Sequence, residues 1–165
     1  MKEEKTGSNI QTATFGAGCF WGVEETFRKI KGVVDTKVGY MGGKMQKPTY
    51  EDVCTDGSGH AEVVQVKYDP SKVKFEELLD VFWNNHNPTT TDRQGPDEGS
   101  QYRSVIFYYT EEQKKTAMKS KENLEKSKKF QNPVVTKIVK ASEFWMAEDY
   151  HQRYLQKRGV NSCHI

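Results

Sequence analysis

The chain has 165 residues, of which 12% are aromatic, and a formal net charge of +2 at pH 7. This length suits one domain with a hydrophobic core of its own, and so small a net charge gives no reason to expect a nucleic-acid partner. No apolar run approaches the roughly 20 residues of a membrane-spanning helix, and the polar start MKEEKTGSNI lacks the apolar stretch of a signal peptide. We therefore expect a cytoplasmic monomer that binds neither membranes nor nucleic acid.

Periodicity in the first half of the chain predicts strands alternating with helices. In chain order we expect a strand over 11–15, a helix over 20–30, a strand over 33–40, a loop rich in Gly, Pro and Thr over 41–59, and a strand over 60–68. The helix has an apolar stripe at helical spacing, and Gly32 can end it. Glu24 and Glu25 are placed in its first turn, where acidic side chains complement the helix dipole.

The second half continues the alternation. In chain order we expect a helix over 75–82, a long polar loop over 84–100, a strand over 101–109, a lysine-rich helix with a solvated face over 114–129, a strand over 134–139 and a helix over 147–158. Thr110 and Gln113 form a capping-box signature for the lysine-rich helix, and Gly159 can end the last helix.

This order, β-α-β-β-α-β-α-β, predicts an α+β fold, a two-layer α/β sandwich resembling the ferredoxin-like pattern. The loops around Tyr50 and Pro96 are longer than most connections, so we expect them to belong to an active site. One domain should span residues 1–165, with an N-terminal extension over about 1–10 and a mobile C-terminal tail over about 159–165 that contains Cys163.

Cys19 lies between a predicted strand and a predicted helix, in the stretch AGCFWGVEE. At a helix N-terminus, unpaired N–H groups and the helix dipole favour a thiolate, and cysteines in such positions often have a depressed pKa. Cys19 is therefore a candidate nucleophile, although its position alone also fits a buried, unreactive cysteine. The rings of Phe20 and Trp21 fit the core, or the wall of a small pocket that accepts a methyl group beside a polar reacting atom.

Four motifs in order resemble the peptide methionine sulfoxide reductase A family: GCFWG at 18–22, PTYEDVCTDGSGHAEVVQV at 48–66, TDRQGPDEGSQYRS at 91–104 and AEDYHQRYL at 147–155. The similarity extends over roughly residues 14–154. It implies a peptide-methionine (S)-S-oxide reductase that needs no cofactor and reduces methionine-S-sulfoxide, free or in proteins, to methionine. The resemblance also implies that Cys19 becomes a sulfenic acid, then part of an intramolecular disulfide, and that thioredoxin or a similar dithiol recycles it.

The strand pattern and the family resemblance together predict the residues of the active site. Strand alternation turns Glu62 to the same face as Val64 and Val66, where partial burial would raise its pKa and keep it protonated longer. Such a carboxyl can protonate a sulfoxide oxygen, and Glu62 matches the family's acid. The resemblance further assigns substrate binding to five residues: Phe20, Trp21, Tyr50, Asp97 and Tyr102.

Two further cysteines are candidates for the resolving thiol that condenses with a sulfenic acid. Cys163 lies in the predicted tail and could reach the site, whereas Cys54 lies near Tyr50 and also fits a packed small residue. The chain has no C-x-x-C motif, and we expect no metal site.

Two other functional classes stay open from the residues. A cysteine hydrolase would need His60 or His151 beside Cys19 to activate the thiol, but spacing does not place either ring there, and His151 is expected to be a structural hydrogen-bonding residue. A thiol redox sensor would form a Cys19–Cys163 disulfide without reducing sulfoxides.

Overall fold

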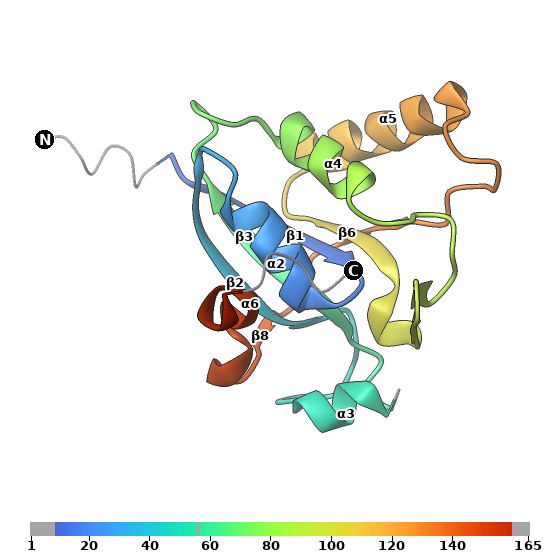
Figure 1. Ribbon diagram of the computed structural model, residues 1–165. Helices are drawn as coiled ribbons and strands as arrows, with labels where there is room; N and C mark the ends of the chain where they lie inside the picture. The colour runs from blue at the N-terminus through green and yellow to red at the C-terminus, as the bar shows by residue number, and fades with distance from the viewer. Residues whose placement is uncertain (1–8, 56, 160–165) are drawn as a thin grey trace, which may run out of the picture.

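The computed structural model describes residues 9–55 and 57–159 (Figure 1). Cys163 and most of the expected N-terminal extension therefore lie outside the described residues. The strands are β1 (Gln11–Ala17), β2 (Val33–Met41), β3 (Ala61–Tyr68), β4 (Arg93–Gln94), β5 (Asp97–Glu98), β6 (Ser104–Tyr108), β7 (Lys137–Lys140) and β8 (Trp145–Met146). The α-helices are α2 (Phe20–Arg28), α3 (Tyr50–Cys54), α4 (Phe75–Asn84), α5 (Glu111–Ser127) and α6 (Tyr154–Arg158), and two 3₁₀ turns are η1 (Ser100–Tyr102) and η2 (Asp149–His151).

Six strands form one sheet in the order β7-β6-β1-β3-β2-β8, and β4 pairs with β5 in a separate hairpin. Every pairing in the large sheet is antiparallel except that of β6 with β7. With five α-helices in the described part of the chain, this is a mixed α/β fold with a mostly antiparallel sheet. The edge strands β7 and β8 extend the sheet beyond the four strands of a ferredoxin-like pattern.

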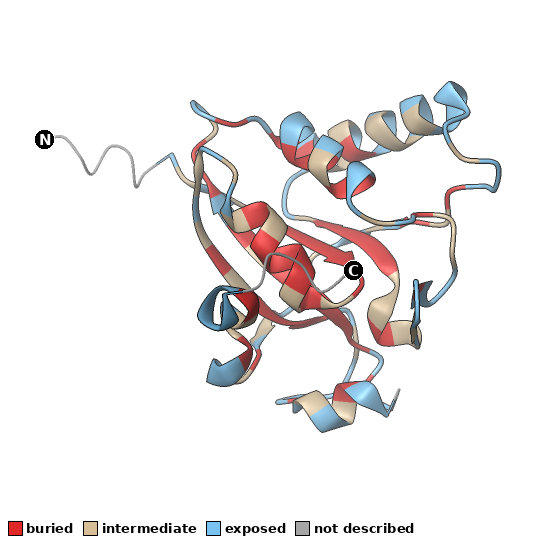
Figure 2. Cartoon of the chain, in the orientation of Figure 1, coloured by how far each residue is buried: buried red, intermediate tan, exposed pale blue. Residues whose placement is uncertain are grey.

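The main core lies between this sheet and the helices α2 and α4. Phe15 on β1 stacks on Phe27 of α2 with ring centroids 5.0 Å apart, and it lies 5.3 Å from Phe82 of α4. In Figure 1, α2 lies across the sheet while α4 and α5 pack side by side. Figure 2 shows the buried residues gathered in the central strands and on α2. Neighbouring side chains of β3 point to opposite faces of the sheet. Val64 packs in this core, whereas Val63 packs in a smaller cluster on the other face.

Two predicted loops contain regular structure. The predicted loop over 41–59 includes α3, which begins with a capping box: the Thr49 hydroxyl accepts from the Asp52 N–H, and the Asp52 carboxylate accepts from the Thr49 N–H. The predicted loop over 84–100 includes the β4–β5 hairpin. Both elements are too short to show a periodic apolar pattern, which is why the sequence did not reveal them.

The ends of two predicted helices also differ. Since α2 begins at Phe20, Glu24 and Glu25 lie beyond its first turn and do not complement the dipole there; both are buried instead. The predicted helix over 147–158 is interrupted, because Arg153 adopts a left-handed conformation with φ +55° between η2 and α6. Gly159, also left-handed, ends α6 as predicted.

Before α5, Thr110 caps the helix by accepting from the Gln113 N–H. The Gln113 side chain, however, accepts from the Tyr109 N–H, so the predicted capping box is only half formed. No helix in the described ranges is long and apolar enough to cross a membrane.

Candidate active site

Cys19 is the N-cap residue of α2, and it is half-buried. The chain turns sharply from β1 into α2 at Gly18, which has φ +101°. A Cβ on Gly18 would lie 2.6 Å from the Gln94 side chain, so both the conformation and the space require glycine. The predicted strand–turn–helix around Cys19 is therefore confirmed, and its sulfur lies at the end of a helix where N–H groups and the dipole favour negative charge.

Glu62 lies beside this helix terminus. Its side chain is buried, and Oε1 accepts a hydrogen bond from the Phe20 N–H at 3.1 Å. The donor is the first residue after Cys19, so the carboxyl of β3 and the thiol of the β1–α2 turn are brought together across adjacent strands. In the strand register Glu62 is paired with Tyr40 of β2.

The aromatic residues after Cys19 have different environments. Phe20 is buried, and its ring centroid lies 6.5 Å from that of Tyr50 and 5.1 Å from that of His151. Trp21 is half-buried, stacks on Tyr154 with centroids 3.8 Å apart, and donates its indole N–H to Nδ1 of His151 at 2.9 Å. The two rings thus form parts of one aromatic cluster beside the thiol.

Two tyrosines add hydroxyl groups to the same region. Burial, followed by the negative charge of Glu62, raises the pKa of Tyr50 and of Tyr102. Both hydroxyls therefore stay protonated at neutral pH and can donate hydrogen bonds. The Tyr102 hydroxyl lies within electrostatic reach of four acidic groups: Glu62, Asp97, Cys54 and Cys19. The structure thus gathers residues from α3, β3, β5, η1 and the start of α2 around one centre.

A family model for "Peptide methionine sulfoxide reductase" matches residues 11–165. The chain belongs to the peptide methionine sulfoxide reductase family. It is 64% identical over 156 residues to peptide methionine sulfoxide reductase MsrA of Methanosarcina mazei, a match that covers 94% of this chain and 74% of that protein. It is 59% identical to the MsrA of Methanoculleus marisnigri over 99% of this chain and 98% of that protein. Its reaction is accordingly the thiol-dependent reduction of methionine sulfoxide.

Solved structures agree with this placement in the peptide methionine sulfoxide reductase family. Reduced Mxr1 from Saccharomyces cerevisiae superposes with a TM-score of 0.87 at 38% identity, over 92% of this chain and 87% of that chain. Methionine sulfoxide reductase A of Corynebacterium diphtheriae gives 0.83 at 36% identity, over 94% and 78%. Mxr1 has also been solved in complex with Trx2, and that structure gives 0.63 at 29% identity, over 89% and 86%.

The two histidines that a cysteine hydrolase would need have other partners in this reductase. His60 is buried and accepts from the Gly43 N–H at Nδ1, while Nε2 donates to the Met45 carbonyl. His151 is fully buried and accepts from Trp21. His151 is thus the structural hydrogen-bonding residue that its position suggested, although it lies on a 3₁₀ turn and not on a helix. Both arrangements argue against a hydrolase.

Cys54 is the last residue of α3 and is exposed, with its thiol hydrogen-bonded to the Tyr50 hydroxyl. Partial desolvation raises the pKa of Cys54, and the charges of Glu62 and Glu51 add to this effect. Cys54 therefore lies next to the predicted site but is less ionised at neutral pH than an ordinary thiol. The structure does not describe Cys163, so no geometry of the tail bears on its predicted role.

Sequence patterns missed Glu148, which holds two parts of the reductase site together. Its carboxylate accepts from the Tyr40 hydroxyl at 2.9 Å and from the Tyr50 N–H at 3.0 Å. Partial burial acts to raise the pKa of Glu148, but these hydrogen bonds hold it below its ordinary value. Glu148 thereby fixes the start of α3, and hence Tyr50, against the C-terminal segment. Only its place in the AEDYHQRYL motif could have pointed to it.

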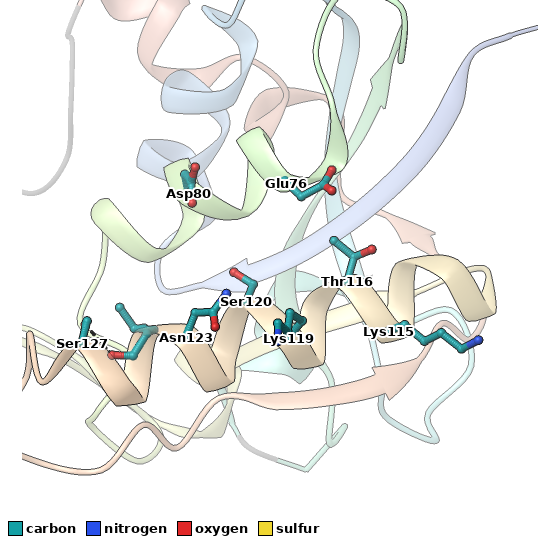
Figure 3. Close-up of a pocket in the computed structure, with 9 residues that line it drawn as sticks. Glu76, Asp80, Lys115, Thr116, Lys119, Ser120, Asn123 and Ser127 are labelled. Atoms are coloured by element: carbon teal, nitrogen blue, oxygen red, sulfur yellow. Dashed lines mark hydrogen bonds between the residues drawn. The ribbon is translucent and has the colours of Figure 1, made fainter.

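A separate hollow of about 500 Å³ lies between α4 and α5 (Figure 3). Its lining combines the acidic side chains Glu76 and Asp80 with Lys115, Lys119 and hydroxyl groups. None of the lining residues belongs to the cluster around Cys19, so this hollow is not part of the reductase site.

Proposed function

We propose that this chain reduces methionine-S-sulfoxide, free or in proteins, with Cys19 as the nucleophile and Glu62 as the acid. The observation that supports this assignment best is the 3.1 Å hydrogen bond from the Phe20 N–H to Glu62. It ties a buried carboxyl to the residue that follows the thiol. The reduction of a sulfoxide requires a nucleophile and a proton donor close to each other.

In the first step, the Cys19 thiolate attacks the sulfoxide sulfur while Glu62 supplies a proton to the sulfoxide oxygen. The oxygen passes to the sulfur of Cys19, so methionine is released and the thiol becomes a sulfenic acid. The substrate sulfur is reduced by two electrons and the Cys19 sulfur is oxidised by two. Tyr50 and Tyr102 would hold the oxygen with their protonated hydroxyls, and Asp97 would support Tyr102 from β5.

Phe20 and Trp21 would accept the substrate methyl group. Phe20 is buried, whereas the half-buried Trp21 can present a ring face to a ligand. An apolar wall beside two hydroxyl donors matches a sulfoxide, whose methyl group and oxygen are bonded to the same sulfur and point in different directions.

In the second step, another thiol condenses with the sulfenic acid, releases water and forms a disulfide. We propose Cys163 for this role, with Cys54 as the rival. A dithiol protein would then reduce the disulfide by thiol–disulfide exchange. The yeast Mxr1–Trx2 complex supports thioredoxin as that partner.

We take the chain as a cytoplasmic monomer without membrane or nucleic-acid partners, with one domain over 1–165, an extension over about 1–10 and a tail over about 159–165. The central order β6-β1-β3-β2 supports the finer description of the sheet as ferredoxin-like.

The proposed function is tested with dithiothreitol as reductant and the S and R epimers of a methionine sulfoxide ester as substrates. Wild type should produce methionine ester from the S epimer over many turnovers, and Cys19→Ser should produce none. Hydrolysis of the ester without reduction would indicate a hydrolase. A single oxidation of the protein by peroxide, without sulfoxide turnover, would indicate a redox sensor.

A further inference from the structure

Trp21 makes two contacts with residues of the C-terminal segment, one through its indole N–H and one through its ring. Its indole N–H binds His151 of η2, and its ring lies against Tyr154 of α6 at 3.8 Å and 11°. Arg158 packs over the Tyr154 ring as well, with its guanidinium carbon 4.4 Å from the ring centroid. The orientation of Trp21 therefore depends on how the turn between η2 and α6 is fixed.

That turn is fixed on α2 by a buried carboxylate. Arg153, in its left-handed conformation, donates its backbone N–H to Oε1 of Glu24 at 2.7 Å. Oε2 of Glu24 accepts from the buried Thr36 hydroxyl at 2.7 Å. Glu24 is only 1% exposed, and a buried carboxyl of this kind is tolerated only when its oxygens are hydrogen-bonded.

Glu24 also lies on the same helix as the ring it would control. It follows Trp21 by three residues, and side chains at this spacing are neighbours on a helix surface. Arg153 lies two residues after His151 and directly before Tyr154. One hydrogen bond therefore couples the helix that presents Trp21 to the turn that presents both of its partners.

We propose that Glu24 is a positioning residue for sulfoxide binding: through the Arg153 N–H it fixes the turn that holds His151 and Tyr154 against Trp21. This inference rests on the proposed role of Trp21 in the substrate pocket. It deepens that role by naming the group that sets the orientation of the indole.

Other contacts of the same turn do not replace Glu24. The Gln152 side chain pairs with both the N–H and the carbonyl of Val38, and so attaches the segment to β2 and not to α2. The Arg153 guanidinium binds Asp35 at 3.0 Å, but both side chains are partly exposed, and such surface pairs contribute little. Burial raises the pKa of Glu24, and the bonds from Thr36 and Arg153 oppose that shift.

The test compares variants that remove or keep the hydrogen bond between Glu24 and the Arg153 N–H. Glu24→Met removes both acceptors and fills the same space, while Glu24→Gln keeps an acceptor for the Arg153 N–H. Arg153→Gly keeps that N–H and suits a left-handed conformation, but loses the guanidinium. Glu25→Met is the matched control, because Glu25 is also a buried glutamate of α2 but binds Arg28 and Lys29.

Two measurements are made on each folded variant. The first is the sulfoxide concentration that half-saturates the single-turnover formation of methionine. The second is the NMR signal of the Trp21 indole N–H, assigned by its loss in Trp21→Phe. In Glu24→Met we expect half-saturation to rise roughly tenfold, equivalent to about 1.4 kcal/mol, with a smaller change in maximal rate and an indole signal shifted toward that of free indole. In Glu24→Gln, Arg153→Gly and Glu25→Met the half-saturating concentration should stay within about threefold of wild type, because each variant keeps an acceptor for the Arg153 N–H.

Several outcomes would overturn the proposal. The first is that folded Glu24→Met has an unmoved indole signal and an unchanged half-saturating concentration. The second is that Glu25→Met raises the half-saturating concentration as much as Glu24→Met does, which would indicate general destabilisation. If Glu24→Met does not fold, hydrogen exchange in wild type decides: the Arg153 amide should be protected as strongly as the amides of α2, and fast exchange contradicts the anchor. If wild type fails to reduce sulfoxide, the proposed function is wrong, yet the indole signal still reports whether Glu24 positions Trp21.

Discussion

The indole N–H of Trp21 donates to Nδ1 of His151 at 2.9 Å, inside a cluster where His151 is fully buried. Because the indole can only donate, His151 must keep Nδ1 unprotonated for this bond to exist. Burial lowers the pKa of His151, with the charge of Glu148 opposing the shift. The neutral ring is therefore the form that the native state holds, and this has consequences for binding and stability.

Sulfoxide binding should weaken in acid through His151. Its folded pKa lies below the ordinary value of 6.5, so binding should be constant at neutral pH and weaken only when the pH falls through that lower pKa. Stability should already decline as the pH drops below 6.5, because the unfolded histidine takes up a proton that the folded one does not. The measurements are half-saturation in single turnover and the free energy of unfolding between neutral and acidic pH. His151→Asn keeps an acceptor without titrating, and an undiminished acid effect in this variant would contradict the assignment.

Glu62→Gln keeps the shape of the side chain and one acceptor oxygen for the Phe20 N–H, but it loses the transferable proton. Since general acids contribute about 10²–10⁴-fold, the methionine-forming step should slow on that order while the protein stays folded. Rapid-quench single turnover measures the step directly. Glu51→Gln, an exposed glutamate of α3, is the control and should leave the rate unchanged. If the rate of Glu62→Gln stays within about threefold of wild type, Glu62 is not the general acid, because the loss is too small.

The two aromatic residues after Cys19 should respond differently to truncation. Phe20 is 1% exposed in the main core, so Phe20→Ala should cost about 3–5 kcal/mol of unfolding free energy. Trp21 is half-buried, and Trp21→Ala should act mainly by weakening sulfoxide binding. Urea unfolding and single-turnover half-saturation separate the two effects. An unchanged affinity in folded Trp21→Ala would show that the indole does not line the pocket.

The resolving thiol can be identified from the first turnover. Cys163→Ser should preserve methionine formation but greatly reduce thioredoxin-driven cycling, and the same assay tests whether small dithiols rescue the variant. Cys54→Ser should cycle normally, because the raised pKa of Cys54 leaves little thiolate for attack at neutral pH. Peptide mapping after one equivalent of sulfoxide should find Cys19 linked to Cys163. A dominant Cys19–Cys54 link, with normal cycling in Cys163→Ser, would transfer the role to Cys54.

Local features of this chain could be predicted from the sequence because they depend on neighbouring residues. Period-two and helical patterns located the longer elements to within a few residues, namely β1, α2, β2, β3, α4, β6 and α5, and the glycine before Cys19 marked the turn into α2. Four motifs in order, among them those around Cys19 and Glu62, indicated the family, and the match to its family model and to MsrA proteins confirms it. Short elements such as α3 escaped, because five residues do not display a period.

What the tertiary structure decided is which distant residues meet. The bond from the Phe20 N–H to Glu62 joins the start of α2 to β3, which are far apart in sequence, and the contact of Trp21 with His151 joins opposite ends of the chain. The break in the last helix has the same origin, because Glu24 binds the N–H of Arg153 in its left-handed conformation. Periodicity reports which face of an element is buried, but not which partner covers it. A buried carboxylate finds its donors only when strands and helices have packed, so these positions became visible only in the folded chain.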